Sequence, residues 1–229
     1  MYPWVIFDAD NTLWETERLY DEARRKLASQ LARRGIDEAT ATEVQQAIDE
    51  ELYKTHGYSA QRFPESFDRT LTYFFPDATD LERDTIRSIA ERVFRDPAAV
   101  HDSVTEVVEQ LRRHYRLGIL TAGENWVQQS RLSQFAHLHH FQAVEVVDQK
   151  NAATFESFIE KHEVDRKNSW VVGDSLKSDI LPAHEVGLNA VLIVTRNWDR
   201  VEMSELRLPL NVESVRDLSE VLKIIPLPN

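Results

Sequence analysis

The 229-residue sequence contains no cysteine, which excludes disulfide bonds and thiolate chemistry. It also lacks any apolar run near the ~20 residues that a membrane-spanning helix requires. Its first residues show neither the basic region nor the apolar segment of a signal peptide, so we expect a cytoplasmic protein with no membrane association. No Lys- or Arg-rich run offsets the formal net charge of -12, which argues against binding of a nucleic acid polymer. A small anionic substrate would need positive charge at its own site.

What the sequence does contain is typical of a globular protein. Apolar residues make up 42% of the chain and charged residues 29%. The length suits one large domain, or one domain that carries a smaller inserted one.

The region 16–96 is expected to be entirely helical. Apolar residues recur there at helical spacing, and Gly35 and Gly57 end successive helices. Thr40 with Glu43 and Thr79 with Glu82 have the spacing of capping boxes, the first for a helix that ends at Gly57. Pro64 suits the first turn of the helix between these two.

The remaining chain alternates between short apolar runs and helical segments, which predicts a doubly wound parallel sheet of the α/β class. An apolar strand at 5–7 belongs to the same sheet, so residues 1–15 and 97–229 form the predicted catalytic core, interrupted by a helical domain at 16–96. The expected strands after the interruption are 117–123, 143–147, 169–173, 189–195 and a short one near 210–212, and the expected helices are 103–114, 125–136, 152–162, 176–186 and 215–224.

Polar residues stand where the predicted strands end. In doubly wound sheets ligands bind beyond the carboxyl ends of the strands, so these residues are the candidates for a functional site. They are Asp8 and Asp10 in "FDADNTLW", Thr121 and Ala122 in "ILTAG", Lys150 in "VVDQKNAATF", and Asp174 and Asp179 in "GDSLKSD".

In this order and spacing, the four motifs resemble those of the haloacid dehalogenase-like hydrolases, and the resemblance covers nearly the whole chain. The region 16–96 resembles the helical cap domain of that family. The resemblance implies a phosphatase, because Asp10 is an acid that the dehalogenases of the family lack.

The residues suit phosphoryl transfer through a phospho-aspartate. Asp8 is the candidate nucleophile, and Asp10 is the candidate general acid and base that protonates the leaving oxygen and then activates water. The hydroxyl of Thr121 and the backbone N–H of Ala122 are expected to hold phosphoryl oxygens, with Lys150 neutralising their charge.

The expected cofactor is Mg²⁺, because the candidate ligands are all hard oxygen atoms. The family resemblance implies ligation by the Asp8 side chain, the Asp10 backbone carbonyl and the Asp174 side chain. Asp179 is expected to support the metal site or to orient Lys150 rather than to bind metal directly.

Several alternatives stay open. A phosphonatase would need a Schiff-base lysine in the helical region, a phosphomutase would need to shield its intermediate from water, and a catalytically idle relative would serve as a binding or regulatory protein. The expected substrate is a small phosphorylated metabolite, for example a nucleoside monophosphate or a sugar phosphate. The nucleotide alternative follows from Asn11, since family members often have Gly there and nucleotidase-like members have Asn. The sequence leaves the oligomeric state open.

Overall fold

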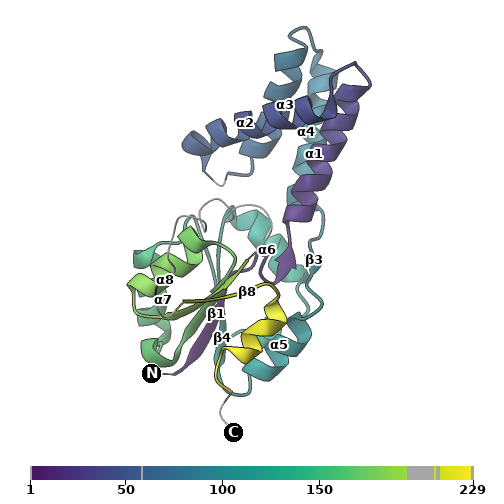
Figure 1. The fold of residues 1–229 in the computed structure, drawn as a ribbon. Helices are drawn as coiled ribbons and strands as arrows, with labels where there is room; N and C mark the ends of the chain where they lie inside the picture. The colour runs from purple at the N-terminus through teal and green to yellow at the C-terminus, as the bar shows by residue number, and fades with distance from the viewer. Residues whose placement is uncertain (1, 58, 195–208, 210–211, 228–229) are drawn as a thin grey trace. The chain divides into compact units, whose positions relative to one another are not determined.

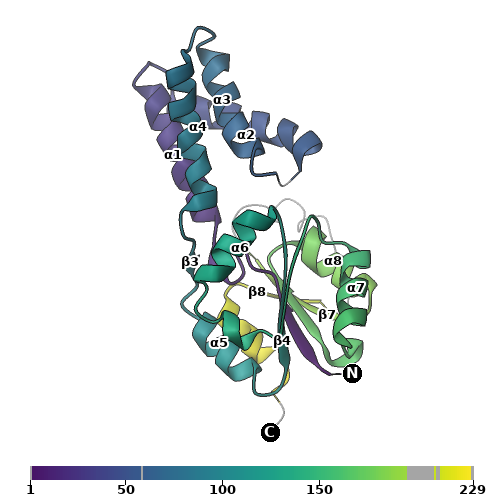
Figure 2. The same cartoon turned by 180° about the vertical axis from the view of Figure 1, so that it is seen from behind.

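The computed structural model describes residues 2–57, 59–194, 209 and 212–227 (Figures 1 and 2). The chain divides into two compact units: Met1–Glu15 with Ala99–Asn229, and Thr16–Ala98. The roles of catalytic core and cap for these units stay a prediction. Within the described part of the chain, no helix is both long enough and apolar enough to cross a membrane.

The first unit is built on a parallel sheet, which confirms the predicted α/β class. Its described strands are hydrogen-bonded in the order β5-β4-β1-β6-β7-β8. Because β1 lies between β4 and β6, the direction in which strands are added reverses beside β1, and ligands bind at such a position in doubly wound sheets. The strands are β1 (Trp4–Phe7), β4 (Arg116–Ala122), β5 (Ala143–Val147), β6 (Trp170–Gly173), β7 (Asn189–Ile193) and β8 (Val212–Val215).

Helices cover both faces of this sheet. Figures 1 and 2 show α7 and α8 on one face and α5 on the other. The α-helices of the unit are α5 (Val104–Leu111), α6 (Asn125–Gln134), α7 (Ala152–His162) and α8 (Leu181–Glu185). Short 3₁₀ turns lie at η1 (Leu138–His140), η2 (Arg166–Asn168) and η4 (Leu218–Lys223).

Two predicted helices differ from the structure. The segment predicted as a helix at 176–186 begins with a π-helical turn, η3 (Leu176–Ile180), before α8. Pro182 lies in the first turn of α8, where it lacks the amide hydrogen that an uninterrupted helix would use. The predicted final helix is the 3₁₀ segment η4. Residue 195 of one predicted strand, and residues 210 and 211 of another, lie outside the described residues.

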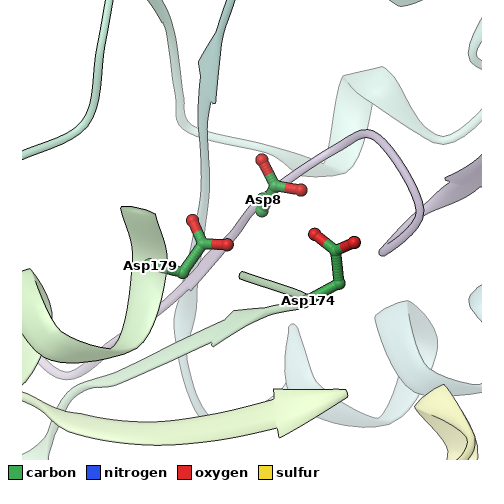
Figure 3. A group of neighbouring side chains, drawn as sticks. All are labelled: Asp8, Asp174 and Asp179. Atoms are coloured by element: carbon green, nitrogen blue, oxygen red, sulfur yellow. The ribbon is translucent and has the colours of Figure 1, made fainter. Parts of the chain in front are cut away.

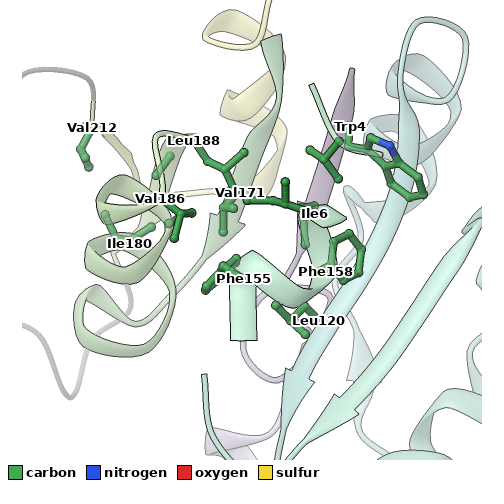
Figure 4. Close-up of a cluster of buried hydrophobic side chains, with 14 of the residues drawn as sticks. Trp4, Ile6, Leu120, Phe155, Phe158, Val171, Ile180, Val186, Leu188 and Val212 are labelled. Carbon is green, nitrogen blue, oxygen red and sulfur yellow. The ribbon is translucent and has the colours of Figure 1, made fainter. Parts of the chain in front are cut away.

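The core of the first unit follows from the two-residue period of the strands. Trp4 and Ile6 point to the face covered by α7, where Phe155 and Phe158 are buried against the sheet (Figure 4). The ring of Phe158 meets that of Trp4 edge-on, with centroids 5.8 Å apart. Complete burial of one such aromatic side chain stabilises the fold by about 1.5–3 kcal/mol.

The second unit consists of helices, as predicted. The helix at Thr79–Glu82 begins with the expected capping box, in which each side chain accepts a hydrogen bond from the backbone of the other residue. The prediction of a capping box at Thr40 is wrong. The helix begins earlier, because the Asp37 carboxylate accepts a hydrogen bond from the backbone N–H of Thr40 at 3.0 Å and thereby caps it. The helices are α1 (Glu17–Ala32), α2 (Glu38–His56), α3 (Arg62–Phe74) and α4 (Asp80–Arg95).

A two-stranded ribbon lies at the point where the chain leaves the first unit and returns to it. Strand β2 (Trp14–Glu15) pairs antiparallel with β3 (Ala99–Val100). Strands of two residues carry no periodicity, so the sequence did not predict this pair. The ribbon buries Trp14, whose ring packs edge-on against Phe135.

Candidate active site

The carboxyl ends of three neighbouring strands bring three of the four predicted motifs together, and the Lys150 motif follows β5, the strand beside β4. Phe7, the last residue of β1, lies level with Ile119 of β4 and with Val172 of β6. The next residue, Asp8, donates its backbone N–H to the carbonyl oxygen of Val172 at 2.9 Å. Residues that follow β1, β4 and β6 therefore share one edge of the sheet.

Three carboxyl groups gather at this edge. Asp8, Asp174 and Asp179 each place one carboxylate oxygen within 4.8 Å of the others, and Figure 3 shows the three groups around a common space. Asp8 and Asp179 are buried, and Asp174 is half-buried. Buried charges of one sign this close repel strongly, so the cluster needs compensating positive charge.

Lys150 supplies part of that charge. Its ammonium group lies 2.5 Å from Oδ1 of Asp8 and also pairs with Oδ1 of Asp179. Burial alone would lower the pKa of Lys150, but the charges of Asp179 and Asp8 outweigh it, so its pKa is raised and the ammonium stays charged. The single positive charge of Lys150 thus lies between two carboxylates and can offset only one negative charge.

The pKa of Asp8 reflects its burial at this site. Burial raises the pKa of the Asp8 carboxyl from 3.8 to about 7, the charges of Asp179 and Asp10 add to the rise, and Lys150 opposes it. Without a further cation, Asp8 therefore holds a proton over part of the neutral pH range. A bound cation would favour the ionised form, which is the nucleophilic one.

Asp179 is fixed by the backbone around it. It lies in the π-helical turn, and its Oδ2 accepts the backbone N–H of Ser175 at 3.1 Å. A Cβ at Gly173 would overlap the Asp179 carboxyl group, so a glycine is required where β6 ends. The contact with Lys150 agrees with the predicted orienting role, which stays a prediction.

Thr121 places a hydroxyl near the carboxyl end of β4. Its side chain is buried at the end of β4, and Oγ1 has no hydrogen-bond partner among the described residues. Buried hydroxyls are nearly always hydrogen-bonded, so an unpaired one at a strand end suits a ligand oxygen. The turn that follows passes through Ala122 and Gly123, and Gly123 has a φ of +138°, which favours glycine.

The Asp10 side chain is held by three donors. Nη1 of Arg131 lies 2.9 Å from Oδ1 and 2.7 Å from Oδ2, Nε2 of Gln128 lies 3.0 Å from Oδ2, and Nε1 of Trp14 lies 2.6 Å from Oδ1. Neither Arg131 nor Gln128 was among the site residues predicted from the sequence. The sequence contains one signal that could have found them. A glutamine and an arginine stand three residues apart on the predicted helix that follows the Thr121 motif, so they share one face of it.

The donor set of the cluster fits a hard divalent cation. The candidate ligands are carboxylate oxygens, and the cluster carries more negative charge than Lys150 neutralises. Mg²⁺ prefers such ligands and is bound in proteins by one or two carboxylates together with water and substrate phosphate. The residues present therefore fit the predicted Mg²⁺ site.

Comparison with known proteins decides the family. The model of the haloacid dehalogenase-like hydrolases matches residues 5–193, which include every candidate site residue. The chain belongs to this family. As a haloacid dehalogenase-like hydrolase, it superimposes on a family member from Xanthomonas campestris with a TM-score of 0.79, at 20% identity over 98% of this chain and 91% of that one.

Two curated relatives of this hydrolase share one name. A protein from Pyrococcus abyssi is 27% identical over 82% of this chain and 79% of its own length, and one from Methanopyrus kandleri is 24% identical over 93% and 90%. Both are named glyceraldehyde 3-phosphate phosphatase.

Proposed function

We propose that this hydrolase is a Mg²⁺-dependent phosphatase that acts on a small phosphorylated metabolite through a phospho-aspartate on Asp8. The observation that carries the proposal is the position of the Asp8 carboxylate. It lies among Asp174, Asp179 and Lys150, on a sheet edge shared with the Thr121 hydroxyl, which has no hydrogen-bond partner within the described part of the chain. A nucleophile, a cation site and donors for phosphoryl oxygens are the parts that phosphoryl transfer needs.

The reaction has two steps. A carboxylate oxygen of Asp8 attacks phosphorus, the bond from phosphorus to the ester oxygen breaks, and that oxygen takes a proton from Asp10. Water then attacks phosphorus and gives a proton to Asp10, and the bond between phosphorus and Asp8 breaks. Inorganic phosphate leaves, and both aspartates return to their starting state.

Positioning and charge account for most of the catalysis in this scheme. The Thr121 hydroxyl and the Ala122 N–H bind phosphoryl oxygens, and Lys150 offsets their negative charge. Asp8, the Asp10 carbonyl and Asp174 would hold Mg²⁺, which when bound would neutralise charge on the phosphoryl group. One well-placed electrostatic contact of this kind is worth about 3 kcal/mol, or on the order of a hundredfold in rate.

Triose phosphates are the first substrates to test, because the curated relatives carry the name glyceraldehyde 3-phosphate phosphatase. Asn11 adds little to the nucleotide alternative. Its φ of +59° lies in the left-handed region that Gly and Asn enter most readily, so the backbone alone accounts for an Asn or a Gly there.

The proposal is tested by hydrolysis assays with and without Mg²⁺. The substrates are p-nitrophenyl phosphate, glyceraldehyde 3-phosphate, glycerol 3-phosphate, a hexose phosphate and a nucleoside monophosphate. We expect Mg²⁺-dependent release of phosphate, loss of activity in Asp8→Asn, and no loss in Asp102→Asn, which changes an exposed aspartate of the same unit. Activity that survives Asp8→Asn would reject the mechanism. Absence of turnover with every ester would favour a binding role.

A further inference from the structure

Gln128 connects Asp10 to the end of β4, and Arg131 binds Asp10 from the same helix. Both residues lie on α6, which begins two residues after Gly123. We propose that Arg131 and Gln128 are positioning residues that place the Asp10 carboxylate for proton transfer to the leaving oxygen. This inference rests on the proposed function, because it assigns a task to Asp10 within that reaction.

The contact between Arg131 and Asp10 is more than a surface ion pair. The Arg131 side chain is only 5% exposed, and one of its nitrogen atoms donates to both oxygens of Asp10. A guanidinium group withdrawn from water is costly unless it is paired, and surface pairs hold their partners only loosely. Arg131 therefore restricts where the Asp10 carboxylate can lie.

Gln128 sets the distance between Asp10 and the phosphate-binding turn. Its Nε2 donates to Oδ2 of Asp10 at 3.0 Å and to the carbonyl oxygen of Ala122 at 3.3 Å. A Cβ at Gly123 would come within 3.2 Å of the same nitrogen, so the glycine leaves room for this amide. One buried amide thus joins the acid to the backbone that is proposed to hold the phosphoryl oxygens.

Gln128 and Arg131 act from one helix face. They are three residues apart, so their side chains lie on neighbouring positions of α6, and both are buried. The third donor is Trp14, four residues after Asp10 in the chain, whose indole N–H donates to Oδ1 of Asp10. Loss of Arg131 or Gln128 frees the carboxylate without removing it.

This role predicts an effect that depends on the leaving group. An alkyl alcohol leaves a phosphate ester only when its oxygen is protonated, whereas p-nitrophenolate leaves without a proton. The parameter kcat/KM reports the steps up to departure of the alcohol. A misplaced Asp10 should therefore lower kcat/KM for alkyl esters and spare kcat/KM for p-nitrophenyl phosphate.

The test compares Arg131→Met, Arg131→Lys and Gln128→Leu with the wild-type protein on both ester classes. The alkyl ester is whichever of glyceraldehyde 3-phosphate, glycerol 3-phosphate, the hexose phosphate and the nucleoside monophosphate the wild type hydrolyses fastest. We expect Arg131→Met to lower kcat/KM for the alkyl ester by about 100-fold, the cost of misplacing a reacting group by an ångström. The value for p-nitrophenyl phosphate should stay near that of the wild type, while its kcat falls because Asp10 also activates water.

Internal controls separate a change in catalysis from a loss of folded protein. The ratio of the two kcat/KM values is measured on one preparation, so any unfolded fraction cancels. Arg131→Lys retains the charge and should recover part of the lost ratio, and Gln128→Leu should shift the ratio in the same direction as Arg131→Met. Arg166→Met removes an ion pair with Glu156 elsewhere in the unit and should leave the ratio unchanged.

The outcomes separate this inference from the proposed function. If the wild type hydrolyses neither ester class, the proposed function fails. If the wild type is active and Arg131→Met lowers both kcat/KM values by the same factor, or lowers neither, then Arg131 has only a structural role and the inference is overturned.

Discussion

The ammonium group of Lys150 lies 2.5 Å from the carboxylate of Asp8 while it also pairs with Asp179. One buried lysine thus serves two buried carboxylates, and Asp174 brings a third carboxylate to the same space. Among the described residues, three carboxylates thus gather around one lysine. This imbalance accounts for the fit of the site to a divalent cation, whereas burial is the main cause of the raised pKa of Asp8.

Removal of Lys150 should affect both activity and stability. Lys150→Met leaves Asp8 and Asp179 buried without their cation, so we expect a fall in kcat/KM on the order of a hundredfold or more. We also expect a loss of about 3 kcal/mol in the free energy of unfolding, measured by urea denaturation at pH 8. Lys167→Met, at an exposed lysine of the same unit, is the control and should change neither quantity. Wild-type stability in Lys150→Met would show that the buried pairs are not coupled to folding.

The raised pKa of Asp8 predicts how pH affects the metal-free protein. The folded-state pKa of about 7 exceeds the ordinary value of 3.8, so the folded state binds an extra proton between these pH values. The stability contributed by that proton is fully present below pH 3.8 and is lost as pH rises through about 7.

Mg²⁺ competes with this proton for Asp8. The increase in melting temperature caused by Mg²⁺ should therefore be larger at pH 8 than at pH 6, as measured by thermal denaturation with Mg²⁺ or with EDTA. In Asp8→Asn the metal-free protein should lose this part of its pH dependence. A larger Mg²⁺ effect at pH 6 would contradict the assignment of the proton to Asp8.

Gly118 of β4 should not tolerate a methyl group. A Cβ there would lie 2.8 Å from Cζ of Phe158 and 3.4 Å from the ring of Trp4. We expect Gly118→Ala to lower the free energy of unfolding by about 1–3 kcal/mol, because an overfilled core forces its neighbours to shift. Urea denaturation followed by tryptophan fluorescence measures this loss, since Trp4 lies in the affected core. The added change Phe158→Leu should recover part of the stability, and no recovery would place the strain elsewhere.

The helical unit contains a buried carboxylate that pairs with two partly exposed arginines. Asp68 is nearly buried and accepts hydrogen bonds at 2.8 Å from two nitrogens of Arg83 and at 2.6 Å from Arg87. The hydrogen bonds from Arg83 lower the pKa of Asp68 despite burial. The stability that the ionised Asp68 contributes is present above its ordinary pKa of 3.8. It is lost as the pH falls through the lowered folded-state pKa of Asp68.

Asp68→Ala should therefore destabilise the helical unit by about 1–2 kcal/mol, a value reduced because both arginines are partly exposed. Far-UV circular dichroism of the full chain follows this unit through its helix content. Glu65→Ala, which removes a more exposed pair with Arg69, should cost less than about 0.5 kcal/mol. Equal effects of the two changes would mean that burial of Asp68 adds nothing.

Short-range patterns in the sequence were enough to predict the α/β core, the helical region and the residues at the strand ends. The reason is that apolar periodicity reports which face of an element is buried, and parallel strands end at one edge of a sheet. The strand at 143–147 and the helix at 152–162 were predicted residue for residue. Local signals failed where two residues compete for the same task, as at the start of α2, where Asp37 rather than Thr40 caps the helix.

The partners of each charged group depended on tertiary packing. Arg131 and Asp10 are 121 residues apart in the chain, and their contact exists only because the fold brings α6 beside the loop that follows β1. The double pairing of Lys150 likewise requires Asp8, Asp179 and the end of β5 to meet in space. Sequence order specifies which chemical groups reach the sheet edge, but distance and burial decide which of them share a proton, a cation or a hydrogen bond.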